Sequence, residues 1–482
     1  MRRHGWLCLL ASVGFVAGAC SRGSSSAKTP VAAPTTVVAS APTTAASGAA
    51  ASGAAAGSGS GSGTSCNTTL QATDIGVTPT EITIEVMADV GSPLAPGLFQ
   101  GNIDAIKAFA DSVNANGGLA CRKLLVRTWD SKLDPTEAKD GQIDSCQNAF
   151  AMVGTNALFN PDVTPMTGCV DKSGQATGLP DIAAVTADSN EECAPTTFAI
   201  PGVPDMCPIT AGVRPIIVPV GPLKWQLRQN PALHGLLLVA GDLPSTVQVE
   251  VPAILADQQA GMVWDATPKV SGADAQPAYT PRVELAKAKG STYVYDGSND
   301  VAMVRMRKEA AAQGLTSVKV WDCSIACYTK AFLAQGGSAV EGTYVSLGFL
   351  PFEEASYNAE DQAYVNAVGI GKVDSFGAGA WQAGVAFQTA VNTVVAQDGP
   401  NGLTRANLMQ ALKGMKNFSA NGWLGPKSLQ GPGSISPCFL IMQVRGGKFV
   451  RVYPTKPGTM DCSPSNLMTV SIDPVTAAAK LK

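Results

Sequence analysis

The chain has 482 residues and a formal net charge of −3, and no run of lysine or arginine marks a basic patch. This charge pattern argues against nucleic acid as a partner. The length exceeds what one ordinary hydrophobic core serves and indicates at least two lobes.

The first 20 residues have the three parts of an export signal: two arginines, an apolar run from residue 6 to 16, and small residues directly before Cys20. The run is too short for a permanent membrane-spanning helix. The small residues and Cys20 resemble the lipobox of bacterial lipoproteins, although Ala17 stands where a larger aliphatic residue is usual. The resemblance implies lipidation of Cys20 and an anchor on the extracytoplasmic face of the cell membrane. The alternative is an ordinary signal peptide in which Cys20 has no role.

Residues 21–65 consist mainly of Ala, Gly, Ser, Thr and Pro and end in the repeat GSGSGSGTS. Such a segment cannot bury enough apolar surface to offset its conformational entropy. It predicts a disordered tether that lets a folded body stand away from a membrane.

From about residue 76 the pattern alternates between strands and helices. The segment EITIEVMADV at 81–90 is rich in β-branched residues and predicts a strand. Asp134 and Pro135 are start signals of a later helix. Further strands of this set are expected at 123–130, 149–154 and 182–186. Strands that are apolar on both sides belong to parallel sheets covered by helices.

The alternation begins again after a proline-rich passage at 201–222. Strands of this second set are expected at 235–241, 262–265, 292–296 and 318–322, and helices at 252–260, 280–289, 301–313 and up to about 334. The later elements are expected to be a strand at 342–352, helices at 378–395 and 404–412, and a hairpin at 438–453.

These two sets predict an α/β fold of two doubly wound parallel-sheet lobes joined by a hinge. We assign 76–205 and 342–435 to the first lobe, and 206–341 and 436–482 to the second. In such sheets ligands bind at the carboxyl ends of the strands. Two lobes that face each other across a cleft would bring those ends together in a monomer.

Ten cysteines lie in the body of this exported chain, and their even number predicts disulfides. Zinc is the alternative, but the body has one histidine, His234, and no CxxC pair. We therefore expect no metal site. The sequence leaves the pairing open, and the near-neighbour pairs that we expect are Cys121–Cys146, Cys323–Cys327 and Cys438–Cys462.

The body offers little for catalysis. His234 precedes a buried strand, which favours a structural role over a nucleophile–base pair. The motifs HExxH, G-x-S-x-G and GxxxxGK[ST] are missing. We therefore expect a binding protein without enzymatic activity and without a cofactor.

Polar loops follow several of the expected strands, at 88–97, 154–159, 186–190, 296–300 and 322–327. A helical pattern follows each loop, and helix N-termini present free N–H groups and a positive dipole end. A carboxylate ligand would suit such a place. The alternative for any one of these residues is an ordinary turn or capping role.

A family resemblance covers nearly the whole body. Residues 76–135 have a strand with a small-residue loop, the helix end VNANGG, and WDSKLDP before a capped helix. They resemble the amino-terminal part of the Leu/Ile/Val-binding proteins, which are type I periplasmic solute-binding proteins of ABC importers. Residues 310–322, 336–345 and 377–391 continue the resemblance. The chain also resembles a cysteine-rich subgroup of actinobacterial lipoproteins.

The resemblance implies that the chain captures a small solute, such as an amino acid or related carboxylate, and delivers it to an ABC permease in the membrane. Main-chain amides would bind a carboxylate, Asp300 or Asp322 would bind an amine, and Phe159 would form an apolar wall. The ligand-binding residues that we expect are Ser92, Thr155, Asn156, Phe159, Thr186, Asp188, Ser189, Ser298, Asn299, Asp300, Asp322 and Ser324.

The chain departs from this family after the third strand, where residues 157–159 replace a usual serine, and the insertion at 160–180 is longer. Both features are compatible with a bulkier or more apolar solute. The alternative function is a ligand-sensing lipoprotein of the same fold that signals to a partner receptor. A hydrolase on this scaffold would need a nucleophile and a base in the cleft.

Overall fold

The structure is a computed structural model that describes residues 68–92, 97–201, 204–241, 244–429 and 434–476. The expected signal peptide, the tether and the lipidation site Cys20 lie outside the described residues. Residues 63–482 form one unit, and the two lobes below are parts of it.

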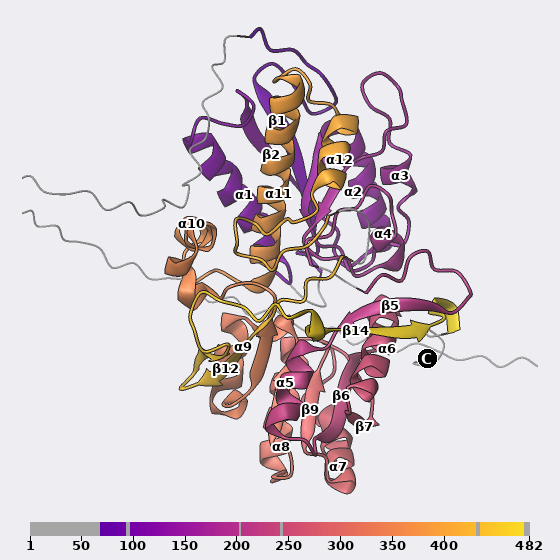
Figure 1. Cartoon of the computed structure of the whole chain (residues 1–482), viewed down its shortest axis with the longest axis vertical. Coiled ribbons are helices and arrows are strands. Elements are labelled where there is room, and N and C mark those ends of the chain that lie inside the picture. Colours follow the sequence, from indigo (N-terminus) through magenta and orange to yellow (C-terminus); the bar gives the residue numbers. More distant parts are fainter. Residues whose placement is uncertain (1–67, 93–96, 202–203, 242–243, 430–433, 477–482) are drawn as a thin grey trace, which may run out of the picture. The chain divides into compact units, whose positions relative to one another are not determined.

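A four-stranded parallel sheet with the strand order β2–β1–β3–β4 forms the centre of the first lobe. Its strands are β1 (Glu81–Ala88), β2 (Lys123–Asp130), β3 (Ala151–Thr155) and β4 (Asp181–Ala183). Its early helices are α1 (Gln100–Ala115), α2 (Pro135–Asn148), α3 (Thr164–Thr167) and α4 (Ser189–Glu192). Three late helices, α10 (Ala359–Val368), α11 (Ser375–Asp398) and α12 (Arg405–Gly414), lie among these elements (Figure 1, orange).

Helices cover both faces of this first sheet. On one face Ile84 packs with Ile106 of α1 and Ala380 of α11. On the other face Met87 packs with Ala138 of α2. A parallel sheet covered in this way exposes only its edges and its strand ends.

A glycine at the end of β3 allows the close contact with α1 and α11. Gly154 has a φ of +80°, and a Cβ atom there would lie 2.7 Å from Ile106 Cγ1 and 3.1 Å from Ala380 Cβ. Glycine alone combines this backbone conformation with the required space. Gly154 is the first residue of the polar loop expected at 154–159.

The second lobe contains a mixed sheet with the order β13–β12–β11–β10–β9–β6–β7, and β8 also pairs with β6. Its strands are β6 (His234–Ala240), β7 (Val263–Ala266), β8 (Lys269–Val270), β9 (Tyr293–Asp296), β10 (Val320–Cys323), β11 (Tyr344–Leu347), β12 (Leu440–Arg445) and β13 (Lys448–Tyr453). The α-helices are α5 (Gly221–Gln229), α6 (Pro244–Gln259), α7 (Thr280–Lys289), α8 (Asp300–Ala312) and α9 (Lys330–Gly336). The 3₁₀ helices of the chain are η1 (Gln276–Tyr279), η2 (Ile325–Cys327), η3 (Gly337–Val340), η4 (Phe352–Tyr357) and η5 (Pro464–Asn466).

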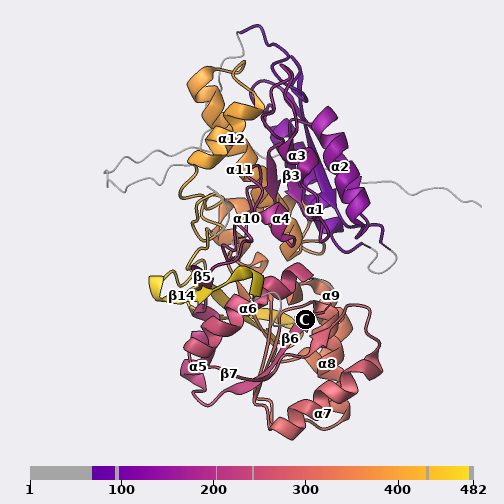
Figure 2. The same ribbon diagram turned by 90° about the vertical axis from the view of Figure 1, so that its right-hand side faces the viewer.

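Helices α5 and α6 cover one face of the second sheet, and α7, α8 and α9 cover the other (Figure 2). On the α5–α6 face, Leu223 packs near Tyr293, and Ile254 packs near Tyr295. A separate antiparallel pair, β5 (Arg214–Pro219) with β14 (Leu467–Ile472), packs against α6. This pair lies next to the face that carries the candidate site.

The type of most elements agrees with the sequence analysis, and several boundaries differ. Helix α6 begins at Pro244 rather than at 252. Pro252, which we took as the helix start, lies inside the helix. The strand expected at 342–352 ends at Leu347. The proline-rich passage contains β5 and the first residues of α5, which we did not expect.

The expected return to the first lobe at residue 342 is wrong for β11. This strand pairs in parallel with β10 and antiparallel with β12, so it belongs to the second sheet. Apolar alternation identifies a strand but does not specify which sheet it joins, because both sheets offer similar edges.

The described residues contain four disulfides: Cys146–Cys169, Cys193–Cys207, Cys323–Cys327 and Cys438–Cys462. The last two are the expected pairs. The expected pair Cys121–Cys146 is wrong, although Cys121 is itself disulfide-bonded. Cys146 and Cys169 share the α2 side of the first sheet, whereas Leu119, close to Cys121 in sequence, packs on the other side.

Within the part of the chain that the structure describes, no helix combines the length and the apolar character that a membrane span requires.

A buried arginine connects helix α12 to the disulfide Cys146–Cys169. Arg405 is fully buried, and its guanidinium donates to the carbonyl oxygens of Cys146 and Val170 at 2.8 and 2.9 Å. It also donates to Cys169 Sγ at 2.9 Å. Several acceptors therefore depend on one side chain.

We predict that Arg405→Met lowers the free energy of unfolding by about 2–4 kcal/mol, because it leaves buried acceptors without a donor. Urea denaturation measures this change. The control is Lys413→Met, at an exposed position of the same helix, which should change stability by less than about 0.5 kcal/mol. Equal effects of the two substitutions would contradict the assigned role of Arg405.

Candidate functional site

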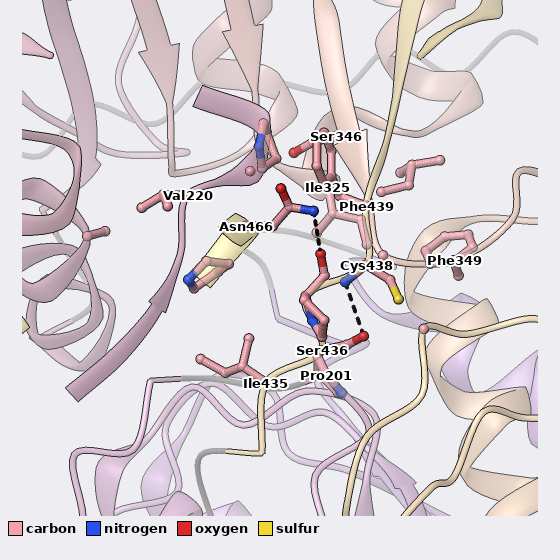
Figure 3. Close-up of a pocket in the computed structure, with 18 of the residues that line it drawn as sticks. Pro201, Val220, Ile325, Ser346, Phe349, Ile435, Ser436, Cys438, Phe439 and Asn466 are labelled. Atoms are coloured by element: carbon pink, nitrogen blue, oxygen red, sulfur yellow. Dashed lines mark hydrogen bonds between the residues drawn. The ribbon is translucent and has the colours of Figure 1, made fainter. Parts of the chain in front are cut away.

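A cavity of about 440 Å³ is lined by residues of both lobes and of the segments that connect them. Its volume lies in the range of small-molecule pockets. Figure 3 shows Pro201, Ile435 and Ser436 on the side of the first lobe, and Ser346 and Ile325 on the side of the second. Asn466 donates through Nδ2 to the carbonyl oxygen of Pro437 at 3.0 Å.

Of the twelve ligand-binding residues expected from the sequence, Asp322 lines this cavity. It lies in β10, and its Oδ2 accepts a hydrogen bond from the Tyr293 hydroxyl at 3.1 Å and one from Gln226 Nε2 at 3.4 Å. Ser324 follows in the next loop, where its backbone N–H donates to Asp296 O at 2.9 Å. Its neighbour Ile325 lines the cavity.

The expected residues of the first lobe lie beside the cavity rather than on its wall. The carbonyl oxygen of Thr155 accepts from the N–H groups of Ala184 and Val185 at 2.9 and 3.2 Å, and both of these residues line the cavity. The side chains of Thr155, Asn156, Thr186 and Ser92 are buried, and that of Phe159 is half-buried. The loops therefore position main chain at the cavity, while these five residues are not part of its described lining.

The remaining expected residues have capping and turn roles. Asp188 accepts from Asn190 N at 2.9 Å at the start of α4, where Ser189 is the first residue. Asn299 accepts from Ala302 N at the start of α8. Ser298 Oγ donates to Asp296, and Asp300 accepts from the Thr329 hydroxyl.

The structure adds a part of the cavity that the sequence analysis missed. Three carboxylates and three aromatic side chains gather where α5 and α6 cover the second sheet, and we call this part the acidic chamber. Its lining residues are Glu250, Asp257, Trp264, Tyr293, Tyr295 and Asp322. The rings of Trp264 and Tyr293 lie 5.7 Å apart between centroids.

A sequence signal for the chamber existed in α6. Glu250 and Asp257 are seven residues apart, which corresponds to two helical turns and places both on one face. Because we expected the helix to begin at residue 252, Glu250 lay outside the expected helix and the pair was not recognised. The tyrosines of β9 are two residues apart and therefore point to the same face of the sheet.

Burial dominates the electrostatics of the acidic chamber. It raises the pKa of Glu250 to about 8, that of Asp257 to about 8 and that of Asp322 to about 6. Negative charge on Asp257 and Asp296 adds to the effect on Glu250. These three carboxylates form no ion pair with any Lys, Arg or His in the described ranges.

Two other features supply positive electrostatic potential or donors. Gly221 and Leu223 line the cavity in the first turn of α5, and no side chain caps this helix. Lys427 also lines the cavity, but its Nζ donates to the carbonyl oxygens of Ala199 and Ile200 at 2.7 and 3.0 Å. Burial lowers the Lys427 pKa to about 7. No group of metal-ligating side chains is found among the described residues.

The periplasmic binding protein family matches residues 81–448, which is more than half of the chain. The chain belongs to the periplasmic binding protein family. This family consists of extracytoplasmic proteins that bind small-molecule solutes and work with ABC transporters. No curated protein sequence matches the chain.

Solved structures share the type I periplasmic binding protein fold. An ABC transporter substrate-binding protein from Aeropyrum pernix has 11% identity and a TM-score of 0.63, over 83% of this chain and 99% of that one. A fatty acid ABC transporter substrate-binding protein from Thermomonospora curvata has 15% identity and a TM-score of 0.58, over 80% and 97%. A solute-binding protein from R. palustris in complex with benzoate has 16% identity and a TM-score of 0.58, over 79% and 98%. At identities this low, the structural similarity shows a shared fold and nothing about the solute.

We predict that Glu250→Gln is more stable than the wild type at pH 8, by a larger margin than at pH 5. The wild-type carboxyl has a pKa of about 8 when folded and an ordinary pKa when unfolded, so its contribution to stability is present below pH 4.5 and is lost as the pH rises to 8. Glutamine does not ionise, so the variant should gain on the order of 1–3 kcal/mol over the wild type across this range. Urea denaturation at both pH values measures the gain.

The control for this experiment is Glu284→Gln, which removes the same charge at an exposed position on α7. Its stability should follow that of the wild type at both pH values. If Glu250→Gln behaves in the same way, Glu250 does not ionise in a buried environment.

Proposed function

We propose that this chain captures a small organic solute, an amino acid or related carboxylate, in the described cavity for ABC-type import. The observation that carries the proposal is that both lobes line one cavity of ligand size. The partner is an ABC permease, and the lipid anchor at Cys20 would hold the monomer at the extracytoplasmic face of the membrane.

The segments between the lobes support a capture mechanism by closure. The chain passes between the lobes after α4, after β11 and after α12, and Pro201, Phe349 and Leu424 of these segments line the cavity. A solute held there would contact both lobes and the connections at once. Such a ligand favours the closed arrangement by its differential affinity for that state.

The uncapped start of α5 suits the carboxylate of the solute. The first N–H groups of a helix have no intrahelical partner, and the dipole places partial positive charge there. Gly221 and Leu223 in this turn line the cavity. Apolar side chains such as Phe349 and Phe439 would contact the rest of the solute.

We predict that Gly348→Trp prevents solute binding. Gly348 lines the cavity, and a Cβ atom there meets no heavy atom within 4 Å, so the indole would extend into open space rather than into the core. A panel of amino acids, short-chain acids, amides and amines, screened by thermal shift and then by calorimetry, identifies the binding solutes. For these solutes the variant should raise Kd at least about 100-fold.

The matched control is Gly371→Trp. Gly371 is exposed, and a Cβ atom there also has open space around it. This variant should bind like the wild type. Unchanged binding in the Gly348→Trp variant would show that the solute site lies elsewhere in the protein.

A further inference from the structure

We infer that the solute carries a positively charged nitrogen, as an ammonium or guanidinium group, which binds in the acidic chamber of the second lobe. The inference rests on the proposed function and narrows its solute class. For an amino acid, this nitrogen would belong to a basic side chain rather than to the α-ammonium group that every amino acid carries.

The geometry gathers three carboxyl groups at one end of the cavity. Glu250 and Asp257 come from one face of α6, and Asp322 comes from β10 on the sheet below. Asp322 already accepts hydrogen bonds from Tyr293 and Gln226. The Trp264 indole favours the charged form of Asp257. Glu250 therefore has the most capacity for an additional donor.

Glu250 is the decisive residue. Its side chain lines the cavity although the residue is only 8% exposed, and no hydrogen bond joins it to the rest of the described chain. A buried carboxyl group without a donor is costly, and an ionised one is more so. A ligand N–H group would supply the missing donor and the opposite charge together.

The described residues that line the cavity do not supply that charge. Lys427 is the cation among the lining residues, and its Nζ is directed at two carbonyl oxygens of the first-lobe segment. Trp264, Tyr293 and Tyr295 complete the chamber wall. Aromatic rings stabilise cations by their quadrupoles, which favours an organic cation over a neutral or anionic group.

The affinity for a cation should depend on pH. The titratable groups that interact with Glu250 are Asp257 on α6 and Tyr295 and Asp296 on β9. Asp322 on β10 interacts with Tyr295. Burial raises the pKa of each of these groups, so part of the cluster is protonated at pH 6 in the empty protein. A bound cation favours the ionised carboxylates, so binding releases protons and tightens as the pH rises from 6 to 8.

Isothermal titration calorimetry with the full-length protein tests the inference. The probes are putrescine, butanediol and succinate, which share a four-carbon chain and differ in the charge of their ends, together with arginine and leucine. We expect putrescine or arginine to bind, with a Kd that falls at least about threefold between pH 6 and pH 8. The Glu250→Gln variant should raise this Kd at least about tenfold.

The exposed charge variant Glu284→Gln is the matched control and should leave the Kd unchanged. Circular dichroism and the urea midpoint of Glu250→Gln establish that the variant is folded. Binding of succinate, butanediol or leucine without binding of putrescine or arginine would overturn the inference and leave the proposed function intact. Cation binding that Glu250→Gln does not weaken would also overturn it. Failure of the proposed function gives a different result: Gly348→Trp would then leave the Kd of every binding solute unchanged.

Discussion

Parallel strand pairing is the constraint on which the rest of this structure depends. In the first sheet β1 pairs in parallel with β2 and β3, and in the second β9 pairs in parallel with β6 and β10. Parallel strands need crossover helices, and these helices bury both faces of each sheet. The residues that follow the strands are then the main places where polar groups meet a ligand.

The candidate site extends beyond this rule. The first lobe contributes main chain after β4 and the start of α11, as expected for strand-end loops and helix N-termini. The second lobe also opens between its sheet and the helices α5 and α6, where Tyr293, Tyr295 and Asp322 would otherwise be covered. The cavity therefore combines an uncapped helix start with an acidic chamber. These two ends have opposite electrostatic character.

The carboxylates of the chamber also carry a cost for folding. Burial without a compensating cation keeps Glu250 and Asp257 largely protonated near neutral pH. Stability and ligand preference therefore depend on the same carboxyl groups. A bound cation would favour their ionised form and offset the free-energy cost of burying them. A chain selected only for stability would place apolar residues on this face of α6.

The sequence by itself determined most element types and the α/β class with its two sets of strands, because apolar periodicity and capping signals are local. It placed Asp322 near the site for the same reason, since this residue ends a strand. The binding class followed from the family resemblance. Only the tertiary structure decided that β11 joins the second sheet, that Cys146 pairs with Cys169, and that Glu250 lines the cavity. Each of these depends on which surfaces meet across long sequence separations, and residue pattern along one segment carries no information about its partner.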